Sequence, residues 1–206
     1  MLTVNHAEVL NLHNAMRGAR NPMNSWARSD SYFNEQGQFV LGENDLSLAI
    51  RLRKAGSDHR KFLRQVFVTV DINDPLYWWK EYDTYKVSTV ANSTSTMHKI
   101  TSAPFDLPQF SCDKMDKGTL AVMQTIIDKL EELRQQFLDT KDKQYWYDII
   151  QLLPSSYNQM RTCTMNYETL INIYHARKNH KLDEWHVFCD FIRTLPYAQE
   201  LIICEE

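Results

Sequence analysis

The second half of the chain has apolar residues at helical spacing. Between residues 117 and 139 an apolar residue recurs every three or four positions, which is the period of one face of an α-helix. Residues 142–153 and Leu182–Leu195 repeat this pattern, with aromatic residues among the apolar positions. The pattern predicts three amphipathic helices. The apolar positions of the longest are Leu120, Met123, Ile127, Leu130, Leu133 and Phe137.

A strand pattern stands in the first half. Residues 65–72, QVFVTVDI, are rich in β-branched side chains that alternate with polar ones, and a shorter strand is expected at Leu2–Val4. After the strand at residues 65–72, Asp74 is expected to cap a helix with Pro75 in its first turn. This helix carries the aromatic residues of LYWWKEYDTYK. They are suited either to stacking on a flat heterocycle or to a core or subunit interface.

A polar segment separates two further elements near the N-terminus. Residues 24–42 are rich in Ser, Asn and Gln, which predicts a loop. Asn44 or Asp45 is then expected to cap a helix that runs to about Ala55. With few glycines and prolines, the chain does not fit a turn-rich all-β fold. The elements together predict an α+β fold in a single domain over residues 1–206.

Charge and cysteine usage exclude several classes of protein. A formal net charge of −3 gives no general attraction to nucleic acid, and no apolar run is long enough to span a membrane. The N-terminus lacks the pattern of a signal peptide, so we expect a cytoplasmic protein. The cysteines and histidines show no metal-ligand spacing, and we predict no metal site. Cys163 and Cys189 are expected to be reduced core residues.

Two polar residues stand out in the stretch from Leu153 to Trp185. Pro154 ends whatever helix precedes it, and helical spacing resumes from about Thr164. Asn166 and Arg177 are eleven residues apart, about three turns, so both are expected on the apolar face of the new helix. Polar groups in such a place need partners. Either they form a cap or a buried ion pair, or they bind a ligand.

This stretch resembles the C-terminal part of flavin-dependent thymidylate synthases. In that family a Leu-Pro turn leads into a helix with a characteristic spacing of Asn, Leu and Arg. The resemblance implies an α+β fold with a small antiparallel sheet and a long-helix bundle. It also implies that the asparagines contact the flavin and that the arginine contacts the uridylate. The matching residues here are Leu153, Pro154, Asn166, Leu170, Asn172 and Arg177.

The family signature R-H-R-x-x-S-x-N-x-x-S-x-R is largely lost in residues 85–97. One register keeps Asn92 and Ser95 but replaces R-H-R by Tyr85, Lys86 and Val87, and shifting by one residue places Lys86 on the second arginine. The resemblance therefore assigns Asn92, Ser95 and Lys86 to the nucleotide. Lysine lacks the bidentate fork of arginine, so other cations are expected to replace the missing ones. The candidates are Arg161, Lys178, His180 and Lys181.

The Ser/Thr residues of this stretch have two interpretations. Hydroxyl groups can help to hold phosphate, but such a run also forms solvated loops. Ser88, Thr89 and Thr94 belong to it together with Ser95.

The resemblance implies an enzyme that methylates dUMP reductively. FAD would carry the chemistry, with NADPH and methylenetetrahydrofolate as co-substrates, although the lost signature predicts weak FAD binding. One alternative is a non-catalytic protein of the same fold that binds a pyrimidine nucleotide, and another is a helical interaction protein. Asn166 and Asn172 lie about 120° apart on a helix, which favours a site at a subunit junction. The family is tetrameric, and we expect a homotetramer.

Overall fold

The computed structural model describes residues 2–204, which form two compact units. The first unit contains residues 2–3, 72–84 and 92–161, and the second contains residues 4–71, 85–91 and 162–204. Each unit is thus assembled from three separate stretches of the chain. The expectation of a single domain over residues 1–206 stays a prediction.

A four-stranded sheet has the order β1-β4-β6-β5. Thr69 on β4 is hydrogen-bonded to Thr164 on β6 (2.9 Å), and the hydroxyl of Thr162 donates to Asp71 (2.5 Å). As the residue number on β4 rises from 69 to 71, the number of the bonded residue on β6 falls from 164 to 162, so these two strands are antiparallel. This confirms the α+β fold with a small antiparallel sheet. The strands are β1 (Thr3–Leu10), β4 (Phe67–Pro75), β5 (Thr89–Ser93) and β6 (Asn158–Asn166).

The end of β4 differs from the sequence-based expectation. Asp74 is a buried residue of the strand itself, and Pro75 occupies the N-cap of the helix α3 (Leu76–Tyr82). The predicted Asp74 cap is therefore wrong, because the strand continues up to the proline that starts the helix. The aromatic residues of α3 pack as a core, with Trp78, Trp79 and Tyr82 all buried.

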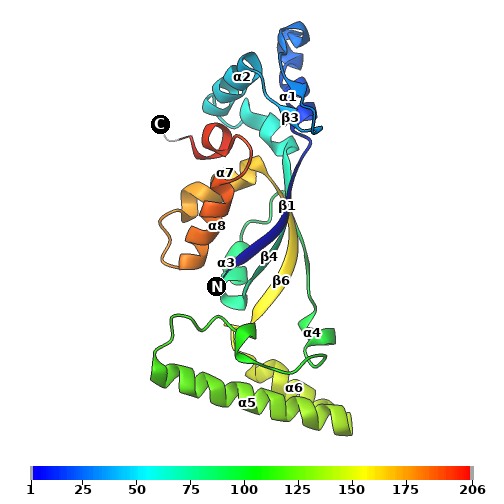
Figure 1. Ribbon diagram of the computed structural model, residues 1–206, viewed down its shortest axis with the longest axis vertical. Coiled ribbons are helices and arrows are strands. Elements are labelled where there is room, and N and C mark those ends of the chain that lie inside the picture. Colours follow the sequence, from blue (N-terminus) through cyan, green and yellow to red (C-terminus); the bar gives the residue numbers. More distant parts are fainter. Residues whose placement is uncertain (1, 205–206) are drawn as a thin grey trace. The chain divides into compact units, whose positions relative to one another are not determined.

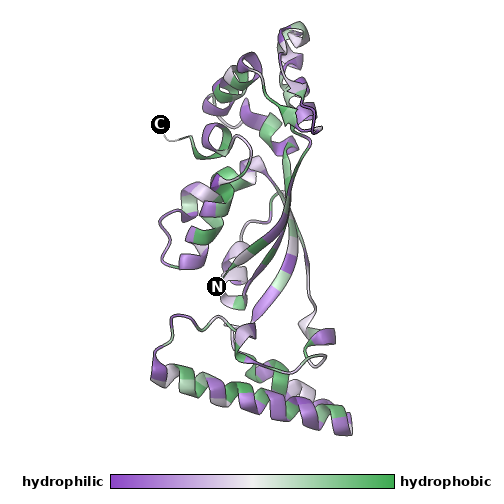
Figure 2. Ribbon diagram, viewed as in Figure 1, coloured by the Kyte–Doolittle hydropathy of each residue, from purple (hydrophilic) through white to green (hydrophobic). Residues whose placement is uncertain are grey.

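Two helices of the first unit pack against each other (Figure 1). They are α5 (Lys117–Thr140) and α6 (Lys143–Leu152), as their spacing predicted, and Asp116 and Asp142 cap them. Figure 2 shows apolar and polar residues alternating along α5. The apolar residues form a stripe on one face of the helix, and most of this stripe is buried. The short helices α4 (Thr96–Lys99) and η4 (Leu107–Gln109) belong to the same unit. The buried core is formed by Ile100, Phe105, Phe110, Met123, Ile127, Leu130, Leu133 and Ile149.

The second unit is built around α7 (Tyr167–Arg177), which packs on α8 (Asp183–Arg193) and on two short helical segments. A two-stranded antiparallel hairpin interrupts the predicted loop over residues 24–42. The remaining elements are α1 (Leu12–Ala19), η1 (Asn21–Met23), η2 (Trp26–Arg28), β2 (Tyr32–Phe33), β3 (Phe39–Val40), α2 (Glu43–Lys54), η3 (Arg60–Gln65) and η5 (Gln199–Ile203).

The start of α2 is capped from outside the helix. Gly42 holds the N-cap position, and the carboxylate of Asp30 accepts hydrogen bonds from the backbone N–H groups of Asn44 (2.8 Å) and Asp45 (3.1 Å). A Cβ on Gly42 would lie only 2.3 Å from this carboxylate, which explains the glycine. The predicted cap by Asn44 or Asp45 is wrong. Asp45 instead forms a buried ion pair with Arg20 (2.5 Å).

All four cysteines are free thiols, and Cys163 and Cys189 are buried as predicted. Within residues 2–204, no helix combines the length and the apolar character that crossing a bilayer requires.

Candidate functional site

The helix α7 begins later than its apolar pattern suggested. Residues 164–166 still belong to β6, and Asn166 is the N-cap of α7 rather than part of its apolar face. Its side-chain oxygen accepts from Thr169 N (2.9 Å), and its amide donates to the carbonyl of Arg64 (3.2 Å). Asn166 is 2% exposed, so both ends of its amide are used inside the fold. Of the roles that the sequence left open for Asn166, the structure shows the helix cap.

The first turn of α7 also carries a partly buried ion cluster. The carboxylate of Glu168 accepts hydrogen bonds from Arg60 (3.1 Å) and from Arg64, and only 13% of its side chain is exposed. Burial alone would raise the pKa of Glu168, but the hydrogen bonds from Arg64 and Arg60 outweigh it and lower the pKa. An anion in the first turn also complements the helix dipole.

Further along α7, a cationic pocket of about 910 Å³ opens, here called the α7 pocket. Asn172, His175 and Lys178 line it from α7, while Arg53 comes from α2 and Arg60 from η3. Arg53 donates to the carbonyl of Ile202 (3.2 Å). Its Nε is buried, and within residues 2–204 it has no hydrogen-bond partner. Several cations with donor capacity around one cavity make a site suited to an anion.

Arg177 is held by two aromatic rings. Its Nε donates to the hydroxyl of Tyr85 (2.8 Å), and its guanidinium carbon lies 4.7 Å from the ring centre of Trp185 and 5.5 Å from that of Tyr85. Such packing fixes the plane of the guanidinium and adds cation–π stabilisation. Arg177 is therefore orientated before any ligand arrives. It does not line the α7 pocket.

The other predicted site residues of the second unit are dispersed. Lys86 follows Tyr85 and is exposed. His180 accepts a hydrogen bond from the backbone of Leu182 (3.2 Å) and stands edge-on to Trp185, and Lys181 is exposed. Among the predicted flavin residues, Asn172 is the one that lines the α7 pocket.

Asn92 and Ser95 belong to the first unit. Asn92 is exposed on β5, and the hydroxyl of Ser95 accepts from His98 N (3.1 Å) as the cap of α4. Arg161, a suggested substitute cation, lies in the same unit, where it pairs with Asp83 (2.8 Å) and lies over the ring of Trp79.

Sequence reasoning did not single out Arg53 and Arg60, which complete the α7 pocket. A signal was present, because residues 51–65 contain six basic residues and one acidic residue in a chain whose net charge is −3. Charge averaged over the whole chain hides this local excess.

Comparison with solved structures gives matches over nearly the whole chain. Thymidylate Synthase X (ThyX) from Helicobacter pylori, solved with FAD and dUMP, matches with a TM-score of 0.67 at 16% identity, covering 98% of this chain and 96% of that one. A second Helicobacter pylori ThyX structure, complexed with FAD and dUMP, gives 0.67 and 17%, covering 100% and 99%. The UMP/dUMP methylase PolB from Streptomyces cacaoi, bound with 5-Br dUMP, gives 0.67 and 13%, covering 98% and 95%.

No protein-family profile and no curated protein sequence matches this chain. At this level of identity the structural matches establish the fold. The chain has the fold of flavin-dependent thymidylate synthases, as the resemblance of residues 153–185 implied.

Proposed function

We propose that this protein is a divergent flavin-dependent thymidylate synthase-like protein that binds FAD and a pyrimidine nucleotide. The observation that carries this proposal is the α7 pocket, where Asn172 lies among several cations. The chain also shares its fold with a protein solved with FAD and dUMP. Function does not follow from fold alone, so the proposal depends on these side chains.

The α7 pocket fits the chemistry of a dinucleotide cofactor. Arg53 and Lys178 offer the positive charge that a diphosphate needs, while Arg60 also pairs with Glu168, and the buried Nε of Arg53 is a donor without a partner in residues 2–204. Asn172 adds an exposed amide with both a donor and an acceptor. These residues would hold FAD. When bound, the flavin supplies hydride for the reduction of the one-carbon unit on the pyrimidine.

Arg177 is the residue best prepared for the nucleotide. Tyr85 and Trp185 fix its guanidinium, so a phosphate or uracil oxygen meets a group that has already lost its rotational freedom. Lys86 follows Tyr85 directly and is the one cation in residues 85–97. Pre-orientation of this kind strengthens binding because less entropy is lost when the ligand arrives.

A second candidate is a nucleotide-binding protein that has lost flavin chemistry. It is favoured by the replacement of R-H-R with Tyr85, Lys86 and Val87, which leaves one cation of the family signature. In this case FAD, NADPH and methylenetetrahydrofolate would have no role. The α7 pocket would then hold only the phosphate of the nucleotide.

The experiment is titration of the purified protein with FAD and with dUMP, by calorimetry and by the visible absorption of the flavin. We expect both to bind, and Asn172→Ala to weaken FAD about fivefold, ~1 kcal/mol for one neutral hydrogen bond. Lys54→Ala is the matched control, since Lys54 is exposed on α2 and lies outside the pocket.

The outcomes separate the two candidates. FAD binding with tritium release from labelled dUMP supports the enzyme. Binding of dUMP without FAD binding supports the second candidate. If neither ligand binds, both are overturned. Light scattering tests the further expectation of a homotetramer.

A further inference from the structure

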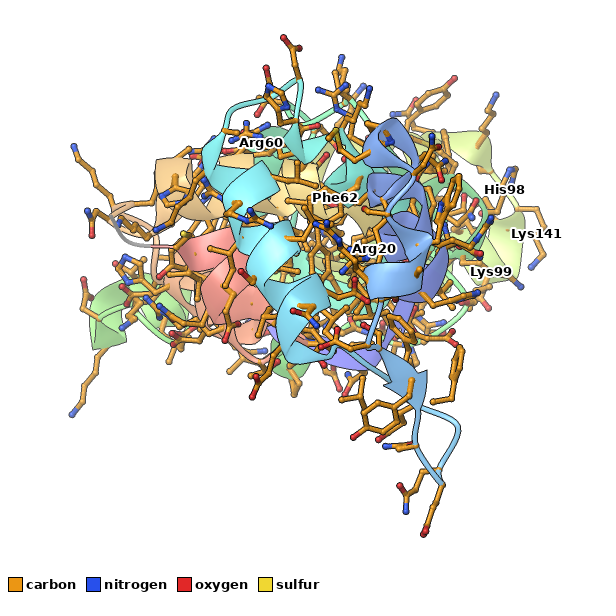
Figure 3. All side chains as sticks on the ribbon, turned by 90° about the horizontal axis from the view of Figure 1, so that it is seen from above. Arg20, Arg60, Phe62, His98, Lys99 and Lys141 are labelled. Carbon is orange, nitrogen blue, oxygen red and sulfur yellow. The ribbon has the colours of Figure 1, made fainter. Side chains whose placement is uncertain are left out.

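A pocket of about 880 Å³ opens beside β1 in the second unit and is here called the β1 pocket. Its walls come from β1 with the start of α1, from the hairpin of β2 and β3, and from the segment that follows α8. Figure 3 shows this hairpin extending away from the helices α1 and α2. The volume is within the range of pockets that hold small organic ligands.

The hairpin wall of the β1 pocket is aromatic. Phe33 of β2 pairs with Phe39 of β3, and their ring centres lie 5.3 Å apart. His13, from the start of α1, stands edge-on to both rings, at 5.5 and 5.8 Å. All three residues line the pocket, and 58% of Phe33 is exposed. A ligand that covers this ring therefore gains apolar contact.

The wall that follows α8 is held in place by two hydrogen bonds. The hydroxyl of Tyr197 accepts from the backbone N–H of Leu41 (2.8 Å), just after β3. The carbonyl of Pro196 accepts from the hydroxyl of Tyr167 (2.8 Å), at the start of α7. Both Pro196 and Tyr197 line the pocket. This wall is thus fixed before a ligand arrives, which lowers the ordering cost of binding.

The charges and dipoles of the β1 pocket favour a cation. Glu8 on β1 is the one formally charged residue among the described residues that line it, and none of them is Lys or Arg. Because β1 is an edge strand, it also presents backbone carbonyl groups on the side away from β4. The faces of aromatic rings attract cations as well. A carboxylate, carbonyl oxygens and aromatic rings therefore line one cavity.

We propose that the β1 pocket binds an organic cation, a ligand with one or two flat rings and a protonated amino group. The rings lie against Phe33 and Phe39, and the ammonium group lies near Glu8. Apolar burial supplies most of the affinity. The carboxylate and the ring faces select against ligands of the same shape that are neutral or anionic.

This site is separate from the one proposed for flavin and nucleotide. The β1 pocket shares no lining residue with the α7 pocket, and Arg177 does not line it. The α7 pocket is lined by several cations, so the two pockets also prefer ligands of opposite charge. The inference therefore does not depend on the proposed function.

The test compares three naphthalene ligands of similar size. Naphthylethylamine is a cation at neutral pH, naphthylethanol is neutral, and naphthylacetate is an anion. Each is titrated into the full chain by calorimetry at low salt, where charge is least screened. We expect the amine to bind at least about fivefold more tightly than the alcohol, and the acetate to bind most weakly.

Charge is tested at Glu8. Glu8→Gln should weaken naphthylethylamine about fivefold and leave naphthylethanol within about twofold, because it removes the negative charge at nearly constant shape. Glu43→Gln is the matched control, since it makes the same change on an exposed residue of α2 outside the pocket. Thermal unfolding of each variant shows whether the fold is retained.

The aromatic wall is tested on the hairpin. Phe33→Leu keeps an apolar side chain but removes the ring face, so it should weaken naphthylethylamine about fivefold and naphthylethanol less. Tyr32→Leu is the matched control. Tyr32 is the preceding residue of β2, is 57% exposed, and does not line the pocket.

Each result decides the proposal. Tighter binding of the amine, with larger losses in Glu8→Gln and Phe33→Leu than in their controls, supports it. Equal binding of the three ligands, or no binding of any of them, overturns it. Equal effects of the two glutamine substitutions overturn the cation preference, and equal effects of the two leucine substitutions overturn the β1 pocket as the site. Displacement of the amine by FAD or dUMP overturns the separateness of the site.

Discussion

The two ends of α7 use polar residues in opposite ways. At the N-terminal end, Asn166 and Glu168 are almost enclosed, and each is bonded to groups of the protein itself. Toward the C-terminal end, Asn172 is exposed and stands with His175 and Lys178 around a cavity. One end of the helix thus serves the fold, while the other presents donors and cations to solvent.

This difference separates two asparagines that look alike in the sequence. The family resemblance assigns both Asn166 and Asn172 to the flavin, but the amide of Asn166 is already satisfied on both sides. A buried amide with two partners contributes to stability and has little capacity left for a ligand. The predictions below test this division, beginning with the largest expected effect.

Asn166→Ala should lower the free energy of unfolding by about 2 kcal/mol, the upper range for an N-cap, because it also leaves the carbonyl of Arg64 without its donor. Asn172→Ala, in the same helix, should change it by less than about 0.5 kcal/mol because Asn172 is exposed. Urea unfolding followed by circular dichroism measures both. Similar losses in the two variants would contradict the division between the two ends.

The second prediction concerns the ion cluster at the N-terminal end. Glu168→Gln should lower the free energy of unfolding by about 1.5 kcal/mol at neutral pH, since it removes the charge that Arg60 and Arg64 share. Glu184→Gln, also in the first turn of its helix, is the comparison variant. Urea unfolding of the three proteins at neutral pH gives the values.

The same carboxylate predicts a pH dependence. The pKa of Glu168 is lowered in the folded state from an ordinary value of 4.5, so its stabilisation is complete above that pH and is lost as the pH falls through the folded pKa. Glu131, hydrogen-bonded to Arg134 in the other unit, has its pKa lowered from 4.5 to about 2 and loses its contribution as the pH falls toward that value. Stability of wild type should therefore fall on acidification more steeply than that of Glu168→Gln. Parallel curves would show that Glu168 is not linked to folding.

The sequence predicted the long regular elements well, because their apolar periodicity extends over many turns. The helices α5, α6 and α8 and the strand β4 were found within a few residues. The boundary at Asn166 was missed, since residues 164–166 fit a helical period although their backbone continues β6. The cap of α2 was missed because its acceptor, Asp30, lies outside the helix.

The candidate site was predictable only in part. Spacing along one helix singled out Asn172, which lines the α7 pocket, and Arg177, which does not, and their roles in binding stay predictions. Arg53 and Arg60 come from α2 and η3, and only the tertiary fold brings them to α7. The role of Asn166 could not be predicted from its residue type, because the side-chain amide of asparagine is equally suited to capping a helix and to binding a ligand.

The fourth prediction concerns Arg177, which is partly buried by its own chain. Arg177→Ala should cost about 1 kcal/mol of stability through lost cation–π contacts with Trp185 and Tyr85, and should also weaken dUMP about tenfold. Arg177→Lys should recover part of the stability but little of the binding, because lysine has no fork. Calorimetry with dUMP and thermal unfolding measure the two effects. Full recovery of binding by lysine would show that only charge is needed.

The smallest effect on stability is expected at Lys178, at the C-terminal end of α7. Its ammonium lies 5.9 Å from the ring centre of Tyr174, near the limit of a cation–π contact, so Lys178→Ala should change the free energy of unfolding by less than about 0.5 kcal/mol. Because Lys178 lines the α7 pocket, the same substitution should weaken FAD about fivefold in low salt. Added salt should narrow the gap between the two proteins, since it screens the lost charge. Calorimetry at two salt concentrations checks this, and a variant that loses stability but binds FAD normally would assign Lys178 to the fold rather than to the ligand.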